Sequence, residues 1–332
     1  MSEVVHPHPE LSGEFEKERR LTLIQQEAAA LVPSRVQLPV ASAEKGYYEL
    51  PMVKEPSWTW EIPLYFFIGG VAGTASVLAG VAELTGASPK LVRDARRISL
   101  VGAMLSPALL ISDLGRPARF LAMLRVFKPQ SPMSVGVWIL MGFSAGTSAA
   151  NAGAWMRARS AFPGLAALLK RIGDVTALAF GLPFASYTGV LVGATVIPAW
   201  NSNASLLPAH FLASGLGASV GLLEIAGNKT PALQWLGLGA AAAESGIGAK
   251  IELNNNPAEA PLKRGPSGWL IRLGGLLSGP VPLALRAASL VMKPRPAMKL
   301  RRYAAVSAMV GSAVTRAAWI YAGHVSARES RP

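Results

Sequence analysis

Residues 175–223 read VTALAFGLPFASYTGVLVGATVIPAWNSNASLLPAHFLASGLGASVGLL and contain no Asp, Glu, Lys or Arg. A second uncharged stretch covers residues 129–156. Both are longer than the roughly 18–20 apolar residues that mark a membrane-spanning helix. Pro198, Asn201 and Pro208 interrupt the longer stretch, which therefore predicts two helices joined by a turn. We expect an all-α integral membrane protein.

The composition of the whole chain leads to the same class. Of the 332 residues, 51% are hydrophobic and 15% are charged, whereas soluble domains average about 25% charged residues. This excludes a soluble enzyme, a disordered tail and a small disulfide scaffold. The chain has no Cys, which excludes disulfides, thiolate nucleophiles and a cysteine-ligated iron–sulfur cluster within it. The net charge of +13 lies in short basic runs between apolar segments, as in membrane proteins, and predicts no nucleic-acid partner.

About eight transmembrane helices are expected within a domain that covers residues 58–325. They lie near residues 62–84, 98–114, 134–155, 174–197, 207–226, 231–249, 267–290 and 303–324. A polar, acidic N-terminal arm (1–57) precedes the domain, and a short polar tail (326–332) follows it. Eight crossings place both termini on the same side of the membrane.

The loops differ in basic charge, and this difference predicts the orientation. The loops on one side carry 14 Lys and Arg residues, and those on the other side carry 7. The more basic loops belong in the cytoplasm. We therefore expect a multi-pass protein of the bacterial inner membrane with both termini outside. The loops at 115–133 and 250–266 are expected on that outer side.

Polar residues inside a membrane are informative because each costs about 2.5–3.5 kcal/mol or more at the bilayer centre. Several share one level near the predicted outer face: Trp60, Glu61, Tyr65, Asp113, Tyr187, His210 and Glu244. His, Tyr and carboxylate groups beside an apolar cavity suit a quinone, because the ring oxygens need hydrogen-bond donors and each redox step needs a proton path. Glu83 and Glu224 lie near the opposite face.

Roles follow from this arrangement. Asp113 and Tyr187 are the first candidates for hydrogen bonding and proton transfer, followed by Glu61 and His210. The residues expected to bind the quinone are Trp60, Tyr65, Asp113, Arg116, Tyr187 and His210. Glu83, Glu224 and Glu244 are expected to form a proton path.

Structural interpretations of the same residues stay open. Aromatic residues such as Trp60 and Tyr65 are typical of membrane interfaces. The carboxylates of Glu61, Glu83 and Glu224 suit helix ends in the headgroup zone, and Tyr187 suits a hydrogen bond to a neighbouring helix. The arginines near the ends of the seventh expected span, Arg272 and Arg286, are expected to reach the headgroups, and the deeper Arg316 is expected to face the bundle.

The loop between the second and third expected spans carries the strongest local pattern. Basic and apolar residues alternate at helical spacing from Pro117 to Phe127, which predicts an amphipathic helix in the membrane interface. One interpretation is an anchor for anionic lipids. The sharper interpretation is a docking surface for an acidic partner, formed by Arg116, Arg119, Arg125 and Lys128.

At this loop the sequence resembles a known family. DLGRPARFLAM at 113–123, followed by FKPQSPMSVGVW at 127–138, is similar to the polysulfide reductase membrane-subunit family, also called the NrfD family. WEIPLYFFIGGVAG at 60–73 resembles the first helix of that family, and GLP with YTGVL at 181–191 resembles its fourth. The resemblance covers roughly residues 57–325.

The resemblance implies a quinone-reactive membrane subunit of an oxidoreductase complex. Menaquinone or ubiquinone is then an exchangeable ligand, and the chain carries no haem or iron–sulfur cluster of its own. The implied partner is a ferredoxin-like iron–sulfur subunit, often joined to a molybdopterin catalytic subunit or a multihaem cytochrome. Family members place polar quinone ligands near the start of helix one and on helix four, and Glu61, Tyr65 and Tyr187 occupy these positions.

Two other functions stay open at this point. One is a proton- or ion-translocating protein that uses Glu83, Glu224 and Glu244 without redox chemistry. The other is a purely structural membrane anchor for a peripheral complex. Binding of a quinone analogue distinguishes them from the first interpretation.

Overall fold

A computed structural model of the chain describes residues 19–20, 22–23, 53–114 and 117–329. The chain divides into two compact units, residues 1–50 and 51–332. Most of the predicted arm (1–57) therefore lies outside the described residues. The described part of the second unit contains helices and no strand, as the all-α prediction requires.

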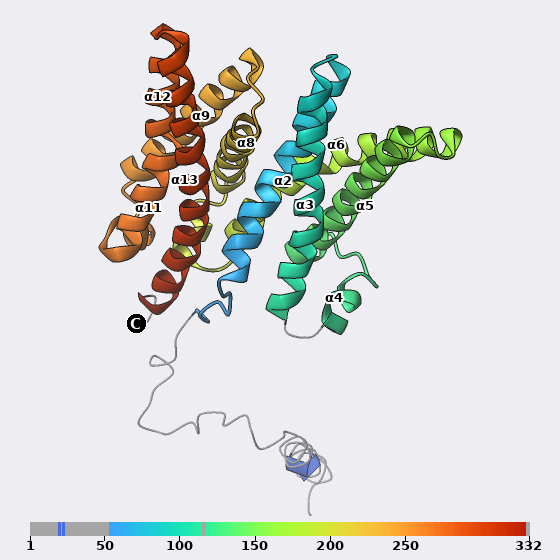
Figure 1. Cartoon of the computed structure of the whole chain (residues 1–332). Coiled ribbons are helices and arrows are strands. Elements are labelled where there is room, and N and C mark those ends of the chain that lie inside the picture. The colour runs from blue at the N-terminus through green and yellow to red at the C-terminus, as the bar shows by residue number, and fades with distance from the viewer. Residues whose placement is uncertain (1–18, 21, 24–52, 115–116, 330–332) are drawn as a thin grey trace, which may run out of the picture. The chain divides into compact units, whose positions relative to one another are not determined.

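Long helices make up most of the second unit (Figure 1). They are α2 (Glu61–Leu84), α3 (Pro89–Leu114), α5 (Pro132–Ala158), α6 (Pro163–Gly193), α8 (Leu207–Ile225), α9 (Pro231–Leu253), α11 (Gly265–Ser278), α12 (Pro280–Val291) and α13 (Pro294–Glu329). Short helices connect them: α4 (Pro117–Met123), α7 (Pro198–Asn201), η2 (Pro257–Glu259) and α10 (Ala260–Lys263). Many helices begin at or next to a proline, whose fixed φ and missing N–H suit the first turn.

The chain is a multi-pass membrane protein. Within the described residues, five helical segments are long and apolar enough to cross a membrane: α2, α3, α5, α6 and the joined α11–α12. Helices α8, α9 and α13 coincide with the remaining expected spans, and their crossing of the membrane stays a prediction. The long uncharged stretch does form two long helices, α6 and α8, with α7 between them.

Helices α3, α6 and α13 begin at Pro89, Pro163 and Pro294, about ten residues before the expected spans. Two further elements differ from the expected ones. The seventh span is divided at Gly279, whose backbone (φ −109°, ψ −91°) leaves the helical region before Pro280 begins α12. A Cβ at Gly279 would lie 3.0 Å from the backbone nitrogen of Ser245 on α9, so the break also permits close packing. The amphipathic helix α4 ends at Met123, short of the predicted end at Phe127.

Helix α2 lies between two groups of helices in Figure 1. It packs against α3 and α6 in one group and against α8 and α13 in the other. Gly73 of α2 permits the close approach to α6, because a Cβ there would lie 2.5 Å from the carbonyl oxygen of Gly181. Small residues at such contacts let helices pack where lipid provides no hydrophobic driving force.

The segment before α2 is attached to the end of α13. The Glu55 carboxylate accepts a 2.6 Å hydrogen bond from Arg328 and lies 3.1 Å from a ring nitrogen of His324. These partners lower the pKa of the Glu55 carboxyl to about 2. Trp58 stacks on Trp200 of α7 with ring centroids 5.3 Å apart. The segment before α2 and the end of α13 therefore lie side by side, and the even number of crossings stays a prediction.

Candidate functional site

A small apolar cavity lies among α2, α3, α5 and α6, beside α4. Tyr65, Asp113 and Tyr187 line it, and we call it the tyrosine cavity. Its apolar wall consists of Trp58, Ile62, Phe66, Leu110, Leu114, Met123, Met133, Val137 and Leu191. The structure therefore brings together three of the residues that the sequence proposed for a quinone site.

Tyr187 is positioned by the first turn of α5. Its hydroxyl donates a 2.6 Å hydrogen bond to the carbonyl oxygen of Pro132. Its ring packs directly over Gly136, where a Cβ would overlap the ring atoms. Ser131 caps the same helix by accepting a hydrogen bond from the Ser134 backbone. The sequence SPMSVG at 131–136 thus begins the helix, accepts the Tyr187 hydroxyl and leaves room for the tyrosine ring.

Tyr65 presents a different polar group to the cavity. Its side chain is 2% exposed and its ring packs against Phe66 and Phe184. The hydroxyl forms no hydrogen bond with any described residue. Buried hydroxyls normally have a partner, so this group is available to a ligand.

Asp113 lies in the last turn of α3, lines the cavity and is partly buried. Among the described residues it is the one carboxylate that lines the tyrosine cavity. Glu61 lies close enough to interact with it electrostatically. The Glu61 carboxylate itself accepts a hydrogen bond from the Thr59 hydroxyl and does not line the cavity.

Several predicted residues lie elsewhere. Trp60 is 67% exposed, and Trp58, which the sequence analysis did not select, lines the cavity instead. His210 lines a second cavity. Arg116 and the side chain of Arg119 lie outside the described residues. Trp58 stacks on Trp200 and meets Phe66 edge to face, and sequence spacing carries no signal of these contacts.

The second cavity has a volume of about 400 Å³ and lies among α8, α9, α11 and α13. We call it the His210 cavity. His210 Nδ1 lies 3.0 Å from Glu244 Oε2, but the two groups are not aligned as a hydrogen bond. Four buried polar atoms on its wall have no hydrogen-bond partner among the described residues: His210 Nδ1, Glu244 Oε1, Thr315 Oγ1 and Trp319 Nε1. Such a group of unpaired atoms is unusual in a folded protein.

The other proton-path candidates are held in ion pairs. Glu224 binds Arg286 at 2.8 Å and Arg301 at 2.5 Å. Arg286 is 1% exposed, so the expectation that it reaches the headgroups is wrong; its partner Glu224 draws it into the bundle. Glu83 pairs with Arg96 and Lys170.

Arg316 faces the bundle, as predicted, and is fully buried. Its guanidinium donates to the carbonyl oxygens of Phe66 on α2 at 3.0 Å and Phe211 on α8 at 2.8 Å. It also donates to the Ser214 hydroxyl at 2.7 Å. Neutral oxygens therefore satisfy this cation, and the residue connects three helices.

The predicted docking loop exposes both cationic and apolar groups. Arg125 and Lys128 are exposed and follow α4. Leu121, Val126 and Phe127 are 64%, 58% and 55% exposed. The surface beside the tyrosine cavity is thus basic and apolar at once, and its role in docking a partner stays a prediction.

The chain belongs to the NrfD family. The family model described as "Polysulphide reductase, NrfD" matches residues 49–228, more than half of the chain. A comparison with curated proteins gives no match. The matched part includes α2 to α8, and with them the tyrosine cavity and the docking loop. Glu244, Arg286 and Arg316 lie beyond it.

The family consists of membrane subunits of quinone-linked oxidoreductases, which assemble with iron–sulfur and molybdopterin subunits. The chain has no Cys. Within the described residues, no group of three or more His, Asp or Glu side chains is arranged to hold a metal ion.

Proposed function

We propose that this chain binds a membrane quinol or quinone in the tyrosine cavity and exchanges its electrons with an iron–sulfur partner subunit. One observation carries the proposal. Tyr65, Asp113 and Tyr187 come from three helices far apart in sequence, and they line one apolar cavity within the family-matched region.

The polar groups of the cavity suit a two-electron, two-proton carrier. Oxidation of a quinol releases two electrons to the partner and two protons to nearby bases. The Asp113 carboxylate at the rim can accept a proton and pass it toward the membrane surface. The Tyr65 hydroxyl can hydrogen-bond a ring oxygen. The Tyr187 proton already points to Pro132, so its phenolic oxygen offers lone pairs as an acceptor.

Ligand entry requires side-chain movement. The cavity has a volume of about 50 Å³, and ligand pockets usually have about 300–1,000 Å³. Met123 of α4 and Met133 of α5 both lie on its wall. Methionine has three rotatable bonds and adapts to irregular space. We infer that these two side chains rotate aside when the ring enters.

The partner docks on the loop beside this cavity. Arg116, Arg119, Arg125 and Lys128 provide the positive charge, and an acidic surface on a ferredoxin-like subunit provides the complement. A molybdopterin subunit or multihaem cytochrome attaches further out. In this arrangement the loop faces the outside of the bacterial inner membrane, and electrons leave without crossing the membrane through this chain.

Quinol turnover by the assembled complex tests the site. Asp113→Asn should lower menaquinol oxidation by about 10²-fold or more because it removes the proton acceptor, and Tyr187→Phe should lower it because it removes a hydrogen-bond acceptor. Asp94→Asn and Tyr303→Phe make the same chemical changes away from the cavity and should leave turnover near that of the wild type. Wild-type turnover in both cavity variants would remove these residues from the mechanism.

Binding of a quinone analogue to the purified chain separates this function from a structural anchor. The proposal expects saturable binding that Tyr65→Phe weakens. A purely structural anchor should show no saturable binding of the analogue. This measurement does not depend on the partner, so loss of the partner during purification does not affect it.

Proton exchange at the His210 cavity is a second candidate function. Four buried polar atoms without a hydrogen bond on the cavity wall favour this function. The helix break at Gly279 also favours it, because the next residue, Pro280, lines the cavity. Broken helices line ion sites in transporters. Glu83 and Glu224 are each paired with two Lys or Arg side chains, whereas Glu244 lies beside the His210 ring and forms no ion pair with a Lys or Arg among the described residues. Glu244 is therefore the carboxylate that this function requires.

The number of protons moved per electron tests this second function. In proteoliposomes, Glu244→Gln should lower that number while analogue binding at the tyrosine cavity is retained. Glu252→Gln at the wall of the same cavity is the matched control, because Glu252 is already paired with Arg272 at 2.5 Å. An unchanged number in the Glu244 variant would exclude proton exchange here.

A further inference from the structure

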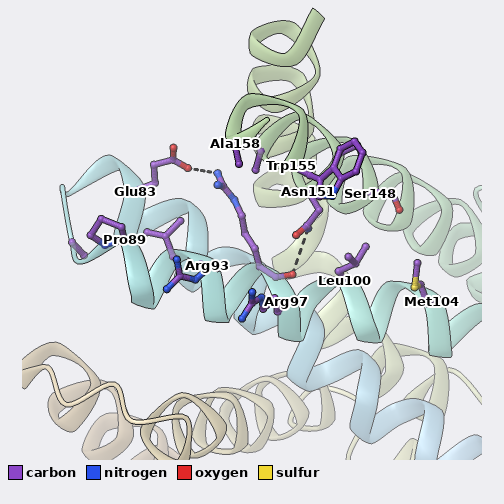
Figure 2. Close-up of a pocket in the computed structure, with 15 residues that line it drawn as sticks. Glu83, Pro89, Arg93, Arg97, Leu100, Met104, Ser148, Asn151, Trp155 and Ala158 are labelled. Carbon is purple, nitrogen blue, oxygen red and sulfur yellow. Dashed lines mark hydrogen bonds and ion pairs between the residues drawn. The ribbon is translucent and has the colours of Figure 1, made fainter. Parts of the chain in front are cut away.

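Helices α3 and α5 separate toward Pro89 and Ala158, the ends away from α4 (Figure 1). A cavity of about 850 Å³ occupies the space between them. We call it the arginine wedge. Figure 2 shows Arg93 and Arg97 on α3 near one end, Leu100 and Met104 further along the same helix, and Trp155 facing them from α5.

The third arginine of the wedge is already neutralised. Arg96 pairs with Glu83 and, at 2.6 Å, with Asp174. Lys170 pairs with the same two carboxylates. Two cations and two anions thus form one balanced cluster. Nothing in this cluster compensates the charges of the other two arginines.

Arg93 and Arg97 supply the excess positive charge. Arg93 forms no ion pair with any described residue. The side chain of Arg97 is 69% exposed and lies 4.0 Å from Asp94. Asp94 is occupied by Lys90 at 2.6 Å. Two exposed guanidinium groups, one helical turn apart, therefore face the cavity mouth without a strong acidic partner.

Apart from Glu83, Ser148 and Asn151, the rest of the wedge is apolar. Met104 is 65% exposed and Trp155 is 58% exposed. Both belong to helices that are long and apolar enough to cross a membrane. The wedge thus combines a cationic end near the predicted membrane surface with an apolar groove that runs into the bilayer. This distribution matches the phosphate and the acyl chain of a phospholipid.

We propose that the arginine wedge is a binding site for one anionic phospholipid. Its phosphate lies between Arg93 and Arg97, and an acyl chain follows Leu100 and Met104 past Trp155. A zwitterionic lipid offers the same chain but carries a cation beside the phosphate, so these two exposed arginines favour a headgroup with net negative charge. This site is independent of the proposed quinone function.

Native mass spectrometry of the full-length purified chain tests the proposal. The probes are phosphatidylglycerol and phosphatidylcholine with identical acyl chains. The wild type should retain phosphatidylglycerol at least five-fold better than phosphatidylcholine. The double variant Arg93→Gln/Arg97→Gln should lose this preference, whereas Lys250→Gln/Arg264→Gln, which removes the same charge elsewhere, should keep it.

A second pair of variants tests the groove without changing charge. Ser148→Phe on α5 fills the wedge and should reduce retention of phosphatidylglycerol several-fold. Ala145→Phe adds the same ring to an exposed position of that helix outside the wedge and should not. Equal retention of both lipids by the wild type would overturn the proposal, as would displacement of the lipid by millimolar inorganic phosphate or unchanged retention in both wedge variants.

Discussion

The Tyr187 hydroxyl and the Pro132 carbonyl oxygen are joined by a 2.6 Å hydrogen bond. The bond connects the C-terminal part of α6 with the first turn of α5, and the docking loop leads directly into that turn. The Lys128 backbone in this loop is bonded at 3.0 Å to the Ser134 hydroxyl of the same turn. The wall of the tyrosine cavity and the predicted partner surface therefore share one rigid element.

Gly136→Ala should disturb this element. The added Cβ would overlap the Tyr187 ring, and overpacking of this kind costs about 1–3 kcal/mol. We expect lower thermal stability and weaker binding of a quinone analogue, measured on the purified chain. Gly246→Ala is the control, since a Cβ there meets no atom within 4 Å and alanine favours the helix by up to about 1 kcal/mol. Equal binding in both variants would contradict the prediction.

Arg316→Gln should destabilise the whole bundle. The shorter amide cannot reach the carbonyl oxygens of Phe66 and Phe211 together, and each buried polar group left unpaired costs about 1–3 kcal/mol. Unfolding in mixed detergent micelles should therefore require less denaturant than for the wild type. Arg302→Gln, an exposed change on the same helix, should leave the transition in place.

Glu224→Gln tests whether this carboxylate is structural. It leaves Arg286 buried without its anion, and loss of one member of a buried pair costs about 3–5 kcal/mol. Glu252→Gln breaks the exposed pair with Arg272, which is worth about 0–1 kcal/mol. We expect a large loss of unfolding free energy in the first variant and a small one in the second. A stable Glu224→Gln variant with altered proton movement would favour a relay instead.

The contact between Glu55 and α13 should depend on pH. The pKa of the Glu55 carboxyl falls from 4.5 to about 2 in the folded chain. The contact therefore stabilises the folded chain fully above pH 4.5, and this stabilisation is lost as the pH falls through 2. Hydrogen exchange of residues 53–60, corrected for the intrinsic rate, should be slow at pH 5 and faster at pH 2.5. Glu55→Gln should remove this dependence, and a wild type with constant protection would refute it.

The helical segments were predictable because proline positions and uncharged lengths are local properties of the chain. The depth of a residue in the membrane follows from its place along a span. That Tyr65, Tyr187 and His210 share one level stays a prediction, whereas their lateral position depends on which helices are neighbours. The arrangement of neighbouring helices places His210 beside Glu244, in a different cavity from the two tyrosines.

Long-range pairing explains the other differences. The burial of Arg286 depends on Glu224, which lies 62 positions away, and no local pattern relates the two. No local pattern shows that Trp58, rather than Trp60, lines the tyrosine cavity, because its contact with Trp200 is also long-range. The break at Gly279 was also missed, because the flanking residues are apolar enough for one continuous span.

The position of Arg316 has a consequence for biosynthesis. The first long helix receives its hydrogen bond at Phe66 from a residue 250 positions later. During membrane insertion, the carbonyl oxygens of α2 and α8 therefore lack this hydrogen-bond donor until α13 has been synthesised. A chain that stops before residue 316 would lack these hydrogen bonds, and its early helices would be more susceptible to proteolysis.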